Sequence, residues 1–333
     1  MDHQHIKLTA SELSYLWNIY QAETMSVQVI HYFLQHIQDE DIKTLLNHSL
    51  SSSKKHVTFI KELFIDEQIE VPIAFNSSDV NLQAKRLFSD VFYLKYIKHM
   101  ATGGLQSYGR VLPNVFRNDI RTFFENCLNA ARDLDRMSTD MLLKKGIPIR
   151  SPHIPYPEKE EFVKKQSFFL EGLGRRDALT GSEVTNLFFN IQTNQIGTTL
   201  ATAFSQVSST KKIQQYFLRG KDIAIKHIKV FTDYLENNSL PIPMSSDQEV
   251  TESTESPFSE KLMLYHFSMM IYSGIGNYGA GISESMRSDL AVDFSRLTAE
   301  ILKYAEDGVN ILINNEWLEQ PPLAADRKGL VEG

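Results

Sequence analysis

The chain has 333 residues, of which 42% are hydrophobic and 23% charged, and its formal net charge is −7. This acidic balance excludes a nucleic-acid backbone as the main partner, because such binding needs a basic surface. No apolar run reaches the roughly 18 residues of a membrane-spanning helix, so no membrane span is expected. The length predicts about two domains. The single cysteine, Cys127, excludes an internal disulfide framework and is typical of a reducing compartment.

An internal repeat divides the chain near its middle. When the sequence is shifted by 171 positions, residues 8–12 (LTASE) fall on residues 179–183 (LTGSE). Without a gap, His56 then falls on His227 and Pro72 falls on Pro243. An internal repeat of this length indicates a repeated structural unit. We therefore predict two structural copies that arose by duplication.

The first two helices of each copy are predicted from caps and from apolar spacing. Thr9 and Glu12 form a capping-box pattern before an amphipathic helix that runs to about Ile37, and Thr180 and Glu183 repeat it. Asp39 or Asp41 then caps a second helix that extends beyond residue 60. Few residues separate the two helices, so they are expected to be antiparallel neighbours.

A long connection follows the second helix in both copies, at about residues 66–81 and 237–256. A helix of about 28 residues is about 42 Å long. About 13 extended residues cover that length at about 3.3 Å per residue. An up-down bundle needs only a short loop at this place, whereas a crossover needs this length. The sequence therefore predicts all-α architecture with two tandem ferritin-like four-helix bundles joined through long crossover connections.

The third helices are predicted at about residues 82–110 and 258–282, where the offset between the copies becomes 170. Fourth helices follow and run to about Lys145 and Asn314, with Asp119 and Asp289 as expected caps. We therefore place the first bundle at residues 1–150 and the second at residues 179–322. Residues 151–178 form a proline-rich linker with a short helix at about residues 158–172, and residues 323–333 form a tail.

Two histidines at equivalent positions are the main candidate site residues. His56 and His227 each lie on the apolar face of a second helix. In an antiparallel hairpin His56 lies level with Gln21 and within a turn of Glu23, and His227 lies level with Gln192. The pairs Gln21–His56 and Gln192–His227 are therefore predicted. Three interpretations stay open: a buried imidazole satisfied by an amide, a polar binding pocket, or a metal ligand.

A di-iron centre is disfavoured by the spacing. Such a bundle supplies a Glu from each of two helices and Glu-x-x-His from the other two. Ser53 and Ala224 stand three residues before the histidines, and the fourth helices contain no histidine. The remaining candidate metal ligands, which do not complete this set, are His56, Glu23, Asp90, His227 and Glu260. We predict no ferroxidase activity, no catalytic residues and no cofactor.

Six segments of the chain have specific sequences: residues 154–159 (IPYPEK), 162–168 (FVKKQSF), 187–194 (LFFNIQTN), 216–221 (YFLRGK), 274–280 (GIGNYGA) and 317–322 (WLEQPP). With these segments the chain resembles a family of Bacillus-type spore formers known as a domain of unknown function, the 3231 family. The resemblance covers nearly the whole chain. The family is ferritin-like with two bundles per chain, and its members are often labelled similar to spore coat protein F.

The resemblance implies a structural or sporulation-linked role in the mother-cell cytoplasm or the spore coat, with coat proteins or a second copy as partners. It implies no catalytic residues. The expected function is thus a non-enzymatic scaffold. The alternative is a binding module with a small-ligand or metal pocket near His56 or His227.

Overall fold

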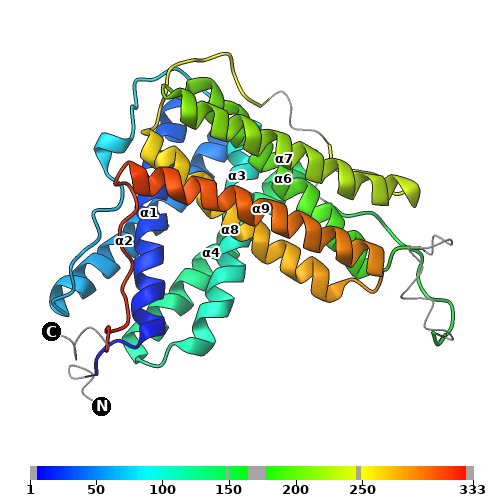
Figure 1. The fold of residues 1–333 in the computed structure, drawn as a ribbon, viewed down its shortest axis with the longest axis horizontal. Helices are drawn as coiled ribbons and strands as arrows, with labels where there is room; N and C mark the ends of the chain where they lie inside the picture. Colours follow the sequence, from blue (N-terminus) through cyan, green and yellow to red (C-terminus); the bar gives the residue numbers. More distant parts are fainter. Residues whose placement is uncertain (1–5, 148–149, 164–177, 245–248, 328–333) are drawn as a thin grey trace.

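The structure is a computed structural model that describes residues 6–147, 150–163, 178–244 and 249–327. The described residues form eight long α-helices and no named strand, arranged as two groups of four (Figure 1). The first group is α1 (Ala10–His36), α2 (Glu40–Asp66), α3 (Asp90–Val111) and α4 (Asn118–Lys144). The second is α6 (Gly181–Val207), α7 (Lys211–Asn237), α8 (Glu260–Glu284) and α9 (Ser288–Asn314). The prediction of two tandem all-α bundles is confirmed.

Hydrogen bonds at the helix ends establish the topology of each bundle. The Glu12 carboxylate near the start of α1 accepts from the backbone N–H of Arg117 at 2.8 Å, next to the start of α4. The Asp90 carboxylate at the start of α3 accepts from the backbone N–H of Asp39, in the turn between α1 and α2. The chain therefore leaves α2 at one end of the bundle and enters α3 at the other. This places residues 67–89 along the length of the bundle as the predicted crossover.

The first residues of the helices test the predicted N-caps. Both capping boxes are formed, at Thr9 and at Thr180. Asp119 and Asp289 do not cap the fourth helices, contrary to the prediction. The N-cap positions are Arg117 and Arg287, and the aspartates instead accept hydrogen bonds from the guanidinium groups of these arginines. Each aspartate thus binds a neighbouring cation, and Asp289 also accepts from the backbone N–H of Leu290 at 2.9 Å.

The third helix begins at Asp90, eight residues later than predicted, because the preceding residues pair with the other crossover. Val80 forms an antiparallel bridge with Phe258, and Phe88 forms one with Val250. Asn81 N–H donates to Pro257 C=O at 2.8 Å, and Thr251 N–H donates to Leu87 C=O at 2.9 Å. At the offset of 170 these contacts correspond in pairs when the two copies are exchanged. The Val80–Phe258 bridge corresponds to the Phe88–Val250 bridge, and the bond from Asn81 corresponds to the bond from Thr251. The two crossovers therefore interlock about a pseudo-twofold axis.

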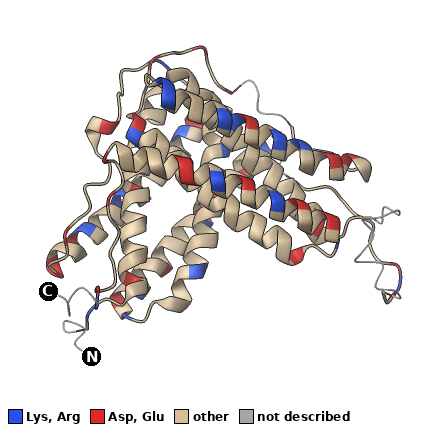
Figure 2. Ribbon diagram, viewed as in Figure 1, with Lys and Arg blue, Asp and Glu red and all other residues tan. Residues whose placement is uncertain are grey.

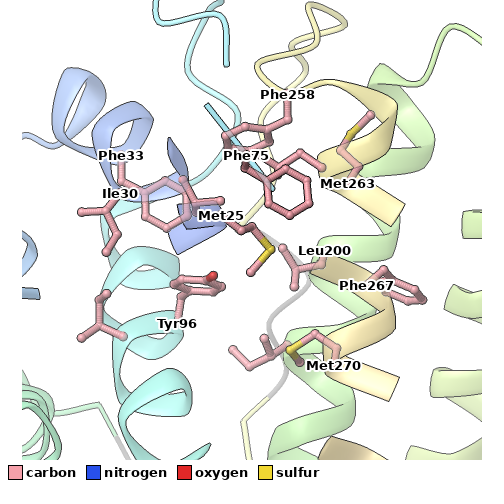
Figure 3. Packing of buried hydrophobic residues seen from close by; sticks show 14 of the residues in the cluster. Met25, Ile30, Phe33, Phe75, Tyr96, Leu200, Phe258, Met263, Phe267 and Met270 are labelled. Carbon is pink, nitrogen blue, oxygen red and sulfur yellow. The ribbon is translucent and has the colours of Figure 1, made fainter. Parts of the chain in front are cut away.

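The hydrophobic core is continuous across the two bundles (Figure 3). In that view Phe33 of α1 and Tyr96 of α3 lie opposite Leu200 of α6 and Met270 of α8, with Met25 between the two sides. Tyr32 packs edge-on against Phe258 at a ring-centroid distance of 5.2 Å. A smaller cluster, which includes Phe231 and Phe294, fills the other end of the second bundle. Most of the buried apolar surface thus belongs to one shared core.

A buried polar contact lies on the same axis. Tyr96 and His266 occupy equivalent positions of α3 and α8, and the Tyr96 Oη lies 3.0 Å from the His266 Nε2. Phe33 and Phe204, also equivalent, flank the pair with centroid distances of 5.3 and 5.7 Å. Burial raises the pKa of the Tyr96 phenol and lowers that of His266 to about 3, so the contact joins two neutral groups.

The segments outside the bundles are described in part. Residues 158–163 are not helical, and the remainder of the short helix predicted at residues 158–172 falls outside the described residues. After α9 the chain returns to the first bundle, where the Glu319 carboxylate accepts from the backbone N–H groups of Ile73 and Ala74 at 2.8 and 2.6 Å. The domain limits at residues 150, 178 and 322 stay a prediction.

Charged residues of both signs are interspersed along the helices, most visibly on α7 and α9 (Figure 2). This mixture agrees with the modest net charge of −7. None of the described helices is long and apolar enough to span a membrane.

Candidate functional site

A polar cluster lies inside the first bundle, at the level of the predicted histidine. The His56 Nδ1 on α2 lies 2.7 Å from a carboxylate oxygen of Glu23 on α1, and both side chains are almost buried. The Tyr108 hydroxyl on α3 donates to the same oxygen at 3.1 Å. The Phe123 ring on α4 packs edge-on against the imidazole. All four helices of the bundle therefore contribute to this cluster.

The ionisation of the cluster follows from its contacts. Burial raises the pKa of Glu23, but hydrogen bonds from His56, Ser53 and Tyr108 and the charge of His56 outweigh burial and lower it overall. Burial and the nearby Glu23 carboxylate raise the pKa of Tyr108 well above its usual value. Burial likewise raises the pKa of the Cys127 thiol. At neutral pH the cluster thus holds one carboxylate, a neutral phenol and a neutral, unreactive thiol.

The second bundle contains an equivalent cluster in which an amide replaces the carboxylate. The Asn194 amide donates to the Tyr278 hydroxyl at 2.9 Å, and the His227 Nδ1 lies 2.8 Å from the same hydroxyl. The His227 Nε2 lies 3.3 Å from the Glu300 carboxylate on α9. Burial lowers the pKa of His227 overall, although its hydrogen bond to Glu300 acts in the opposite direction. His227 is therefore neutral at pH 7.

The predicted glutamine–histidine pairs are not formed. Among the described residues, His56 hydrogen-bonds to Glu23 and not to Gln21, and His227 hydrogen-bonds to Tyr278 and Glu300 and not to Gln192. The two clusters that the copies do share are Glu23–His56–Tyr108 and Asn194–His227–Tyr278. The sequence contained a signal for the tyrosines, because both recur at the offset of 170.

Asp90 and Glu260 do not lie beside the histidines. Asp90 accepts from backbone N–H groups of the α1–α2 turn and pairs with Arg86 at 2.6 Å. Glu260 accepts from the backbone N–H of Thr210, at the equivalent place in the second bundle. Both carboxylates therefore fasten a turn to the start of a third helix. In the part of the chain that the structure describes, no three His, Cys, Asp or Glu side chains are grouped to hold a metal ion.

The polar atoms at the centre of each cluster already have hydrogen-bond partners, and this limits the chemistry that the clusters can perform. In the first bundle, the carboxylate oxygen nearest to His56 already accepts from both neighbours. In the second, the Tyr278 hydroxyl contacts both Asn194 and His227. Closed networks of this kind fix the relative positions of the helices that carry them. Each cluster pairs a histidine with a carboxylate, two side-chain types that are common metal ligands. The Glu23–His56 pair is the closer one, and the His227–Glu300 pair is 3.3 Å apart with Glu300 more exposed.

A comparison with protein families identifies the chain. The sequence model of a family described as protein of unknown function (DUF3231) matches residues 1–159 and again residues 167–330. The chain belongs to this family. The DUF3231 model thus falls once on each bundle, in agreement with the internal repeat. A comparison with curated proteins finds no match.

Among solved structures, this DUF3231 chain is similar to a crystal structure from Bacillus halodurans described as "a putative spore coat protein". The two sequences are 17% identical, and the TM-score is 0.42. The similarity covers 45% of this chain and 98% of the other.

Proposed function

We propose that the protein is a non-enzymatic scaffold of the spore coat or of the sporulating mother cell. The observation that carries the proposal is the interlock of the two bundles over one continuous core. A rigid body of this kind presents fixed surfaces to partner proteins at small entropic cost. The sequence resemblance to proteins labelled similar to spore coat protein F supplies the biological setting. The closed hydrogen bonding of both polar clusters supports a structural use of these groups.

The proposal is tested in the organism that encodes the protein. A fluorescent fusion should accumulate in the mother cell during sporulation and then form a shell around the forespore. Deletion of the gene should change the set of proteins extracted from purified spore coats. A fusion that stays diffuse throughout sporulation, together with an unchanged coat profile in the deletion strain, would overturn the proposal.

A second candidate function, metal binding, is favoured by one contact. Glu23 and His56 place a carboxylate oxygen and an imidazole nitrogen 2.7 Å apart in a nearly buried site, whereas the equivalent of Glu23 in the second bundle is Asn194. A divalent cation bound between these groups would need further ligands from water or from small movements of neighbouring side chains.

Elemental analysis of protein purified without chelator separates the two functions. Metal binding predicts about one metal ion per chain, lost in His56→Ala and retained in the matched control His227→Ala. The scaffold function predicts that all three proteins contain the same trace amount. Equal stoichiometric metal in both variants would place the ion elsewhere and exclude the Glu23–His56 site.

A further inference from the structure

A cavity of about 360 Å³ lies between the two bundles. Helices α3 and α4 of the first bundle form one side, α6 of the second forms the other, and Pro243 and Met244 of the second crossover complete it. Its size falls within the usual range of small-molecule sites, about 300–1,000 Å³. Such sites combine apolar walls with a few polar groups that orient the ligand.

The apolar part of the lining comes from both bundles and both connections. It consists of Leu142, Ile147, Phe189, Ile196, Pro243 and Met244. These side chains could cover one end of a bound molecule and exclude water from it. Removal of apolar ligand surface from water favours binding.

Unused hydrogen-bonding groups face the apolar part. The side chains of His99, Gln192 and Gln195 line the cavity and form no hydrogen bond with other described residues. Thr193, also in the lining, is only 6% exposed, and its hydroxyl has no partner. A buried polar group without a partner destabilises the protein, so a ligand that satisfies it gains affinity. The site therefore offers both donors and acceptors.

The charges around the cavity are already compensated. The Lys98 ammonium group pairs with the Asp135 carboxylate, and Lys95 pairs with Glu249 at 2.5 Å. Burial lowers the pKa of His99 to about 4, so the imidazole is neutral at pH 7. A charged ligand would lose its hydration without meeting a free countercharge. An uncharged ligand avoids this desolvation cost.

The duplication supplies an internal comparison for this surface. At the offset of 170, Lys95 corresponds to Tyr265 and His99 corresponds to Met269. Tyr265 packs against Phe75 of the first crossover at a centroid distance of 5.0 Å. The equivalent surface thus carries larger apolar groups that pack against the neighbouring bundle, so the polar lining belongs to one side of the pseudo-twofold axis only.

From these observations we propose that the cavity between α3, α4 and α6 binds a small uncharged molecule with one apolar end and one hydrogen-bonding end. Its polar end contacts His99, Gln192, Thr193 and Gln195, and its apolar end contacts the Ile147, Ile196 and Met244 side chains.

Three probes of the same shape test the proposal: benzamide, benzoate and benzamidinium. The full-length protein is labelled at its Ile and Met methyl groups and titrated at pH 7 with each probe, and the methyl resonances are followed by NMR. Benzamide should shift the resonances of Ile147, Ile196 and Met244, and the charged probes should bind at least tenfold more weakly. No shift with millimolar benzamide, or equal binding of all three probes, would overturn the proposal.

Variants locate the polar end of the probe. Gln192→Leu and Thr193→Val should each weaken benzamide binding by about fivefold or more, because each removes a hydrogen-bonding group at similar volume. Gln21→Leu is the matched control, since Gln21 is the equivalent residue of the first copy and does not line the cavity. Thermal unfolding of each variant establishes that it is folded. Equal affinity in Gln192→Leu, Thr193→Val and Gln21→Leu would contradict the assignment.

Discussion

At the scale of single residues, the exchange of Glu23 for Asn194 between the copies is the sharpest chemical difference. The Glu23 carboxylate has a pKa below its usual value, so it favours the folded state at pH values above about 4.5, the value of an unperturbed glutamate. This contribution is lost as pH falls through the lowered pKa, because protonation removes the carboxylate that accepts hydrogen bonds from His56, Ser53 and Tyr108. The second bundle has no such contribution from Asn194.

Glu23→Gln should therefore lower the free energy of unfolding at pH 7 by about 1–3 kcal/mol and flatten its decline in acid. Urea unfolding at a series of pH values between neutral and about 3 measures both effects. The same decline with pH in the variant and the natural protein would show that Glu23 is not a source of the acid sensitivity.

The two buried tyrosines should differ in their contribution to stability. The Tyr278 hydroxyl contacts both Asn194 and His227, whereas the Tyr108 hydroxyl donates only to Glu23. Tyr278→Phe leaves two buried polar groups without this partner and should cost about 2 kcal/mol, against about 1 kcal/mol for Tyr108→Phe. Chemical denaturation of the two variants gives the comparison. A larger cost for Tyr108→Phe would contradict the hydrogen-bond arrangement.

At the scale of elements, two of the four glycines of helix α8 have opposite roles. A Cβ atom at Gly281 would lie 2.7 Å from the Phe294 ring of α9, whereas one at Gly279 would have no neighbour within 4 Å. Glycine inside a helix costs about 1 kcal/mol relative to alanine. The first glycine is thus required for the close approach of α8 and α9, and the second is not.

Gly281→Ala is expected to lower the melting temperature, because the Phe294 ring must move away from the new methyl group. Gly279→Ala is the matched control and should raise stability by up to about 1 kcal/mol. Calorimetry on the two variants tests the pair. If both substitutions stabilise the protein, the packing between α8 and α9 is looser than described.

The helices and their crossover could be predicted because their signals are local. Capping boxes at Thr9 and Thr180, apolar spacing and connection length all act within one segment. Prediction of the hydrogen-bond partners of His56 and His227 also requires knowledge of which face of each helix points into the bundle. Gln21 and Glu23 lie at similar heights but about 200° apart around the helix axis. Tyr108 lies on α3, in the other helical hairpin of the bundle. The antiparallel pairing of α1 with α2 therefore could not predict where Tyr108 lies relative to His56.

The start of α3 at Asp90 was missed for a different reason. Residues 80–88 carry apolar spacing that continues the helix pattern, but Val80 and Phe88 pair with the crossover of the other copy. Contacts between segments about 170 residues apart leave no local trace in the sequence. The cavity between α3, α4 and α6 could not be predicted for the same reason.

At the scale of the whole molecule, the account centres on one claim: the duplicated bundles form a single cooperative body. The crossovers pair about a pseudo-twofold axis, Tyr96 and His266 meet near it, and the same cluster of buried side chains extends through both halves. Two bundles that merely followed each other along the chain would unfold separately.

Native-state hydrogen exchange on Phe217→Ala tests this claim most directly. The Phe217 ring is fully buried on α7, and its ring contacts with Phe204, Tyr216 and Phe267 all lie within the second bundle. A substitution of this type costs about 3–5 kcal/mol. The account predicts that the slowest amides of α1–α4 lose the same protection free energy as those of α6–α9. Unchanged protection in α1–α4 would contradict it.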